Sequence, residues 1–209
     1  MSSSTLYRAS GLALLVGAPL LIIGTALNDI LYAGNDPHQY LSPLYAVVTL
    51  VGLLGAVLLL IGIPGVVPRV GRLGFAGFIL TFLGGFLLSS TFVVNLLVFP
   101  WLAQVAPTLA AGGPPAYLIF LLVASALFAL GGILLGIATL RAGILPRFVV
   151  VILIIGVVLN FVGILLTGII ATIVAIVAFV FFASPFGWIG YVLMSERRVE
   201  VARADSASS

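Results

Sequence analysis

Apolar residues fill the last third of the chain almost without interruption. Residues 148–194 contain no Asp, Glu, Lys, Arg or His. As one straight helix this segment would be about 70 Å long at ~1.5 Å rise per residue, whereas the hydrocarbon core of a bilayer is only about 30 Å thick. The segment therefore predicts two membrane crossings, with the chain folding back near Thr167 and Gly168.

Four further apolar segments precede this hairpin, separated by prolines and polar residues. Ser42 and Pro43 fit a helix N-cap followed by proline at the first helical position. Pro100 is expected to end a helix because proline has no amide hydrogen, and residues 100–110 could then form a short helix on the membrane surface. The expected membrane-spanning helices are 9–31, 43–63, 73–99, 115–140, 147–166 and 169–194.

These segments predict an all-α fold, a six-helix transmembrane bundle that forms a single domain over residues 1–195. A cytoplasmic tail, residues 196–209, follows and is expected to be partly disordered. The first segment has an alternative interpretation, because Arg8 followed by an apolar run is typical of a signal peptide. No small-residue cleavage site follows this run, so we favour an uncleaved helix, kinked at Pro19.

The composition excludes several function classes. Hydrophobic residues make up 63% of the chain and charged residues 6%, compared with about 25% charged residues in a soluble domain, so lipid must be the main solvent. The net charge is only +3 and the basic residues are scattered, unlike the concentrated basic face of a nucleic-acid-binding protein. The absence of cysteine excludes disulfides and thiolate catalysis.

The arginines test the six-helix interpretation independently, because cytoplasmic loops of membrane proteins are enriched in basic residues. If the N-terminus is cytoplasmic and the chain crosses six times, all 8 basic residues fall on the cytoplasmic side. The outer side then carries Asp29, Asp36 and His38. Both termini are therefore predicted to be cytoplasmic. The basic residues are Arg8, Arg69, Arg72, Arg141, Arg147, Arg197, Arg198 and Arg203.

Small residues recur at helical spacing along four of the predicted helices. Close backbone approach and interhelical hydrogen bonds hold helices together in lipid, where burying Leu gives no driving force. We expect these faces to point inward, and they could also bind a second copy or another membrane protein. They comprise Gly52, Gly55, Ala56 and Gly62; Gly77, Thr81, Gly84, Thr91 and Asn95; Ser125, Ala129, Gly132 and Gly136; and Gly156, Asn160, Gly163 and Thr167.

The loop at residues 141–147, with the sequence R-A-G-I-L-P-R, lies between two apolar segments. It resembles a cytoplasmic loop of uncharacterised bacterial multi-pass membrane proteins of about six helices. The resemblance covers this loop and its two flanking helices, and it implies a protein of the bacterial inner (plasma) membrane. Because those families have no assigned activity, the resemblance implies no functional residues.

Few polar residues lie inside the predicted helices, and four of them are candidates for a ligand site. Asn95 and Asn160 fall in the outer halves of the third and fifth helices, and Asn28 and Asp29 end the first helix on the same side. They could form a shallow cluster for a small neutral or cationic molecule. The alternative, which we favour, is interhelical hydrogen bonding, worth about 0.6–2 kcal/mol for each residue.

Catalytic chemistry has little support. No Asp, Glu, Lys, Arg or His is expected near the middle of a membrane-spanning helix, although proton-coupled pumps depend on such groups. Asp36 and His38 could bind a metal on the outer face, but this spacing is common by chance in solvated loops. We predict no catalytic residue, no cofactor and no metal site.

Two function classes remain. The first is a non-enzymatic structural or accessory protein that binds membrane lipids or a membrane-protein partner. The second is a small transporter or channel-like protein for a neutral or cationic solute. A polar cavity at mid-membrane depth would favour transport, whereas a dry core with exposed small-residue grooves would favour the first class.

Overall fold

The structure, a computed structural model, describes residues 3–32, 36–112 and 114–207. These residues are helical apart from short connections and include no β-strand, which confirms the predicted all-α class. The six long helices are α1 (Ser3–Leu31), α2 (Pro43–Gly62), α3 (Gly71–Val105), α5 (Pro115–Arg141), α6 (Arg147–Gly163) and α7 (Gly168–Ala207). The shorter elements are the 3-10 helices η1 (Pro37–Leu41) and η2 (Ile63–Arg69), and helix α4 (Pro107–Gly112).

Within the described residues, 5 segments are long and apolar enough to cross a membrane, so the structure supports a membrane protein. These segments are Tyr7–Leu31, Pro43–Gly65, Gly71–Val105, Pro107–Arg141 and Gly168–Ser195. Helix α6 is also apolar, but its 17 residues lie at the lower end of the roughly 17–25 residues that span a bilayer. The predicted total of six crossings therefore depends on whether α6 spans the membrane.

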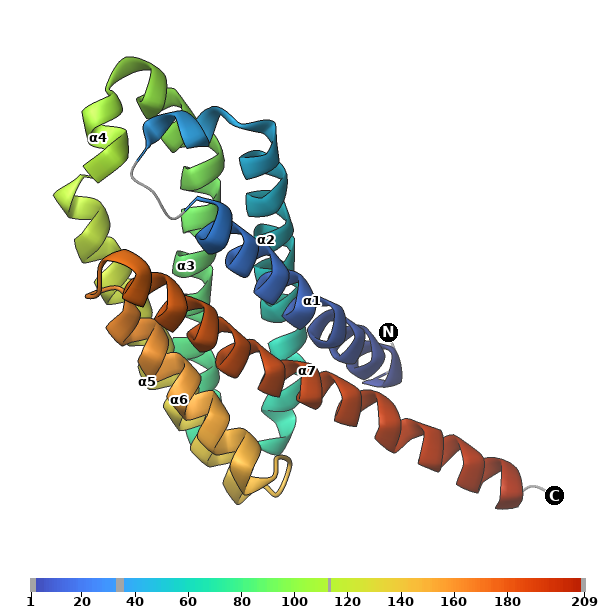
Figure 1. Cartoon of the computed structure of the whole chain (residues 1–209). Coiled ribbons are helices and arrows are strands. Elements are labelled where there is room, and N and C mark those ends of the chain that lie inside the picture. Colours follow the sequence, from blue (N-terminus) through green and yellow to red (C-terminus); the bar gives the residue numbers. More distant parts are fainter. Residues whose placement is uncertain (1–2, 33–35, 113, 208–209) are drawn as a thin grey trace.

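The six long helices form a closed ring. In order around the ring, α1 packs against α2, α2 against α3, α3 against α5, α5 against α6 and α6 against α7, and α7 returns to α1 (Figure 1). The contact between the first and the last helix closes the ring. Each long helix therefore has two neighbours and can direct one face toward the centre.

Glycines permit the closest contacts in this ring. A Cβ atom at Gly24 of α1 would overlap the backbone of Gly52 in α2, and one at Gly84 of α3 would overlap the backbone of Phe128 in α5. Such close approach supplies the van der Waals contact that holds helices together in lipid. Burial confirms the predicted inward faces of α2 and α3 at Gly52, Gly55, Ala56, Gly62, Gly77, Thr81 and Gly84.

The two tight reversals after α5 and α6 both use glycine. Gly143 has a φ of 69° and Gly168 a φ of 68°, a left-handed conformation that other residues rarely adopt. After α5, the Gly143 amide donates to the Leu140 carbonyl at 3.1 Å and the Ile144 amide donates to the Thr139 carbonyl at 3.0 Å, which is a Schellman motif.

Helices α6 and α7 pack against each other, which confirms the predicted reversal near Thr167 and Gly168. The expected helix end at Pro100 is wrong. Helix α3 continues through Pro100 to Val105, because Phe99 and Ala103 on either side are buried in a cluster that offsets the hydrogen bond lost at proline. The predicted membrane span 169–194 corresponds to the apolar segment Gly168–Ser195, and helix α7 continues beyond it to Ala207, through a segment whose Glu, Arg and Ala residues favour helix.

Candidate functional site: a cavity at the centre of the helix ring

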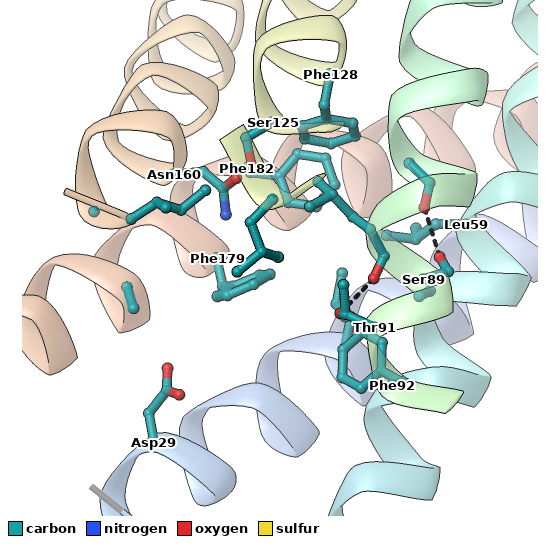
Figure 2. A pocket seen from close by; sticks show the side chains of 18 of the residues that line it. Asp29, Leu59, Ser89, Thr91, Phe92, Ser125, Phe128, Asn160, Phe179 and Phe182 are labelled. Atoms are coloured by element: carbon teal, nitrogen blue, oxygen red, sulfur yellow. Dashed lines mark hydrogen bonds between the residues drawn. The ribbon is translucent and has the colours of Figure 1, made fainter. Parts of the chain in front are cut away.

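A cavity of about 420 Å³ lies at the centre of the ring, and residues from all six long helices line it (Figure 2). Most of its wall is apolar. Phe92 of α3, Phe128 of α5, and Phe179 and Phe182 of α7 contribute aromatic rings, and Leu59 of α2 contributes an aliphatic side chain. Small-molecule sites are typically cavities of roughly 300–1,000 Å³ with apolar walls and a few placed polar groups. This cavity is therefore the candidate site.

Helices α1 and α7 both contribute to the cavity wall, and they run apart toward one end of the molecule (Figure 1). Near the start of α1, Gly11 lies against Gly190 of α7. Toward the other end of α1, Gly24 holds this helix against α2, while α7 lies against Gly156 of α6. At this level α1 is held by α2 and α7 by α6, and α1 and α7 run apart toward the C-terminal end of α1 (Figure 1).

Two prolines mark the level at which these helices part. Ala18 of α1 lies beside Gly187 of α7, and Pro19 and Pro185 adjoin these residues inside their helices. Proline removes an intrahelical hydrogen bond and allows a helix to bend. Helix α1 contacts α2 on both sides of Pro19, at Gly17 and Gly24, and α7 contacts α6 on both sides of Pro185, at Phe182 and Trp188. The prolines are therefore placed to bend α1 and α7 apart while each keeps its other neighbour.

Three oxygen atoms in the cavity wall are buried and have no hydrogen-bond partner among the described residues. They are Oδ2 of Asp29 in α1, Oγ of Ser125 in α5 and Oδ1 of Asn160 in α6. Figure 2 shows Asp29 set apart from the other two. An unsatisfied buried polar group costs about 1–3 kcal/mol, so such groups normally bind water or a ligand.

Two other hydroxyl groups of the wall, unlike these three oxygen atoms, have hydrogen-bond partners within their own helix, α3. The Ser89 hydroxyl donates to the Gly85 carbonyl at 2.7 Å, and the Thr91 hydroxyl donates to the Leu88 carbonyl at 2.6 Å. These bonds meet the donor requirement of both side chains inside their own helix. The demand for an outside partner is therefore concentrated at Asp29, Ser125 and Asn160.

Two of the four residues predicted for a site, Asp29 and Asn160, line this one cavity. Asn28 instead donates its Nδ2 hydrogen to Oγ1 of Thr49 at 3.0 Å, which joins α1 to α2. Asn95 is not among the described residues that line the cavity. Of the four predicted residues, Asp29 and Asn160 therefore belong to the wall of the cavity, and Asn28 has a packing role.

The pattern of the sequence did not reveal most of the wall. Ser125 stands on a stripe of small residues and was assigned to helix packing, but it is only 1% exposed and its hydroxyl faces the cavity without a partner. Phe179 and Phe182 are three residues apart, so they share a face of α7. In an apolar helix, however, nothing distinguishes this face from one that contacts lipid.

The loop residues Asp36 and His38 have a structural role. Asp36 Oδ1 accepts the backbone N–H of His38 at 2.9 Å, so this carboxylate caps the short helix η1. The described residues contain no group of three or more His, Cys, Asp or Glu side chains placed to hold a metal ion. The Asp36–His38 spacing is therefore explained by helix capping.

No protein-family model, curated protein or solved structure matches the chain. What the site can do must therefore be argued from its groups. The described lining residues include one carboxylate, one carboxamide and several hydroxyls, and no His or Cys. Such groups can form hydrogen bonds and attract a cation, but the wall presents no His- or Cys-based pair of nucleophile and base.

Proposed function

We propose that this chain is a non-enzymatic integral membrane protein that binds an apolar or amphipathic molecule of the bilayer in the central cavity. The single observation that carries the proposal is the cavity itself. It occupies about 420 Å³ inside a ring of apolar helices, and its wall is built largely from Phe, Leu and Ala side chains. A molecule that comes from the bilayer gains no hydrophobic free energy there, because lipid is as apolar as the wall, but close van der Waals contact can hold it and the few polar oxygens can orient it.

The proposal includes six membrane crossings, with α6 as the short fifth crossing and both termini in the cytoplasm. Three described, exposed arginines support this orientation, namely Arg72, Arg141 and Arg147. They adjoin the turns after α2 and α5, which fall on one side of the membrane if each long helix crosses once. The loop that resembles those of bacterial multi-pass proteins favours the inner (plasma) membrane.

Membrane lipids are the partners that this function requires. The glycines of the predicted small-residue faces pack between helices of the same chain, as Gly24 does against Gly52 and Gly84 against Phe128. A homo-oligomer or a membrane-protein partner would therefore contact the exposed apolar side chains of the outer surface. Lys and Arg are too sparse and scattered for a nucleic-acid partner.

Filling the cavity should remove the bound molecule. Ala175 of α7 lines the cavity, so Ala175→Phe places a ring where the ligand would lie. We expect native mass spectrometry of protein purified with its lipids to show a bound apolar or amphipathic molecule in the wild type. In Ala175→Phe the affinity should fall by at least about tenfold, or roughly 1.4 kcal/mol of binding free energy.

The matched control is Ala76→Phe, which adds the same ring at an exposed position on α3 and should retain the ligand. Both variants are first compared by size-exclusion profile and melting temperature, so that loss of ligand is not confused with unfolding. Equal occupancy of the wild type and Ala175→Phe would overturn the proposal, as would a wild-type protein that carries no such molecule.

Transport of a small neutral or cationic solute is the second candidate function. The observation that favours it is the position of Pro19 and Pro185, next to the level at which α1 and α7 part. Hinged helices beside a central site are a common basis of alternating access. Accumulation of a labelled solute by proteoliposomes that contain the protein would favour this candidate, and retention of a bound lipid without flux would favour the first.

A further inference from the structure

We propose that the cavity selects a single-chain amphiphile with a cationic amino group, which enters from the bilayer between α1 and α7 and places the amino group at Asp29. This inference rests on the proposed function and specifies the class of ligand. Three features support it: the charge of the wall, the chemistry of its unsatisfied atoms, and the position of Asp29 where α1 and α7 run apart.

The charge of the wall favours a cation. Asp29 is the only ionisable acid among the described lining residues, and no Arg, Lys or His lies among them. The protein therefore supplies no positive partner in the wall for this carboxylate. A buried carboxylate is costly unless it is paired or neutralised, so a ligand that carries the opposite charge gains more here than a neutral or anionic one.

The unsatisfied atoms are all hydrogen-bond acceptors. A carboxylate oxygen and a carboxamide oxygen only accept, and the Ser125 hydroxyl can accept as well as donate. An ammonium group at Asp29 offers three donors and no acceptor, and a hydrogen bond to a charged group is roughly twice as strong as a neutral one. Ser125 and Asn160 lie apart from Asp29 in Figure 2, so they accept from a second donor of the native ligand, such as a hydroxyl group on its chain. A carboxylate or phosphate ligand would instead face Asp29 with repulsion.

The rest of the cavity fits an apolar chain. Phe179 lies between Asp29 and the pair of Ser125 and Asn160 in Figure 2, so a molecule held at Asp29 would extend past this aromatic ring. The volume of about 420 Å³ is near the lower end of the range for ligand pockets. This size favours a single chain over a lipid with two full chains.

Asp29 lies in the half of the molecule where α1 and α7 run apart (Figure 1). Helices α1 and α7 are close at Gly11 and Gly190 and run apart toward the C-terminal end of α1 (Figure 1). In the separated half, Asp29 of α1 and Ala171 of α7 both line the cavity. Asp29 is also only two residues from the end of α1, near the level where lipid head groups meet the hydrocarbon region. An amphiphile could thus slide in with its charged end at that level.

The test compares three twelve-carbon probes that differ only in the head group: dodecylamine, dodecanol and dodecanoate. Their affinity for the purified full chain in nanodiscs is measured by titration, with empty nanodiscs as the reference for partitioning into lipid. We expect dodecylamine to bind at least about tenfold more tightly than dodecanol, as a charge-assisted hydrogen bond would give, and dodecanoate to bind most weakly. In Asp29→Asn the preference for the amine over the alcohol should disappear, while dodecanol binding remains.

Each outcome is decisive. Equal affinity of the wild type for the amine and the alcohol overturns the selection of a cation and leaves the proposed function standing, provided that Ala175→Phe abolishes binding of both. If no probe binds in a manner sensitive to Ala175→Phe, the proposed function itself fails. If Asp29→Asn does not fold, the wild-type head-group series and Ala175→Phe still decide between these results. Retention of the amine preference in Asp29→Asn also contradicts the proposal.

Discussion

Asn160 has a side-chain oxygen whose burial is unfavourable as long as no ligand or water hydrogen-bonds to it. Its Oδ1 atom is buried in the cavity wall and has no partner among the described residues. An unsatisfied buried acceptor destabilises a fold by about 1–3 kcal/mol, and replacement by an apolar side chain of similar size can be neutral or stabilising. If Asn160 contributes to binding and not to packing, its substitution should weaken ligand binding without lowering the stability of the fold.

Asn160→Leu is expected to weaken retention of the native ligand by roughly two- to tenfold, which corresponds to the loss of one hydrogen bond. The melting temperature should stay the same or rise, because the unsatisfied oxygen is removed. Ligand retention is measured by native mass spectrometry and stability by thermal unfolding in detergent.

The control for this prediction is Asn95→Leu, since Asn95 does not line the cavity among the described residues. This variant should keep its ligand. If Asn95→Leu loses as much ligand as Asn160→Leu, or if Asn160→Leu keeps its ligand and melts at a lower temperature, then Asn160 acts in packing.

The sequence identifies polar residues in apolar helices but not the neighbours they face. Asn28 and Asp29 are consecutive, yet Asn28 donates to Thr49 of α2 and Asp29 lines the cavity. Successive residues on a helix point about 100° apart, as 3.6 residues per turn requires. Their different roles therefore depend on the rotation of α1 against its neighbours, which a uniformly apolar helix does not encode in its hydrophobic pattern.

At the scale of the helices, two glycines that look alike in the sequence have different surroundings. A Cβ atom at Gly84 of α3 would overlap backbone atoms of Phe128, whereas one at Gly136 of α5 would make ordinary contact with Val150 and Ile154 of α6 at 3.4 and 3.6 Å. Backbone cannot move aside as the end of a side chain can. Close approach of α3 and α5 therefore requires glycine at position 84, and the contact between α5 and α6 does not require it at position 136.

Gly84→Ala is expected to lower the free energy of unfolding by about 1–3 kcal/mol, the usual cost of forcing an extra methyl group into a packed interface. Gly136→Ala should be neutral or stabilising by up to about 1 kcal/mol, because alanine favours helix over glycine. The melting temperatures of the two variants in one detergent decide this. A Gly84→Ala protein as stable as Gly136→Ala would show that α3 and α5 are not in backbone contact.

Local signals predicted most helix ends, and tertiary contacts changed the others. Gly143 and Gly168 end or begin helices because of their own backbone conformation, and this is readable from the sequence. Pro100 is equally prominent, but α3 continues through it because Phe99 and Ala103 are buried with Ala110 of α4. That cluster joins elements whose approach depends on the whole fold.

At the scale of the whole molecule, the closed ring determines that there is a cavity at all. Its closure joins Gly11 of α1 to Gly190 of α7, residues at opposite ends of the chain. Apolar patterning predicts how many segments enter the membrane, because each segment is local. It does not specify which helices are neighbours, since every helix is apolar on most sides. The cavity could therefore not be predicted from the sequence.

The central claim is that the chain crosses the membrane six times and so places the ring, with its cavity, inside the bilayer. The chain has no cysteine, so single cysteines can be introduced without background. Thr167, which is exposed between α6 and α7, and Ser206, near the end of α7, are replaced in turn by cysteine. Intact cells are then treated with a membrane-impermeant thiol reagent.

We predict that Thr167→Cys reacts in intact cells and that Ser206→Cys reacts only after the membrane is permeabilised. This result requires α6 and α7 to cross in opposite directions, with the C-terminus in the cytoplasm. Labelling of Ser206→Cys in intact cells, or labelling of Thr167→Cys only after permeabilisation, would contradict the six-crossing ring.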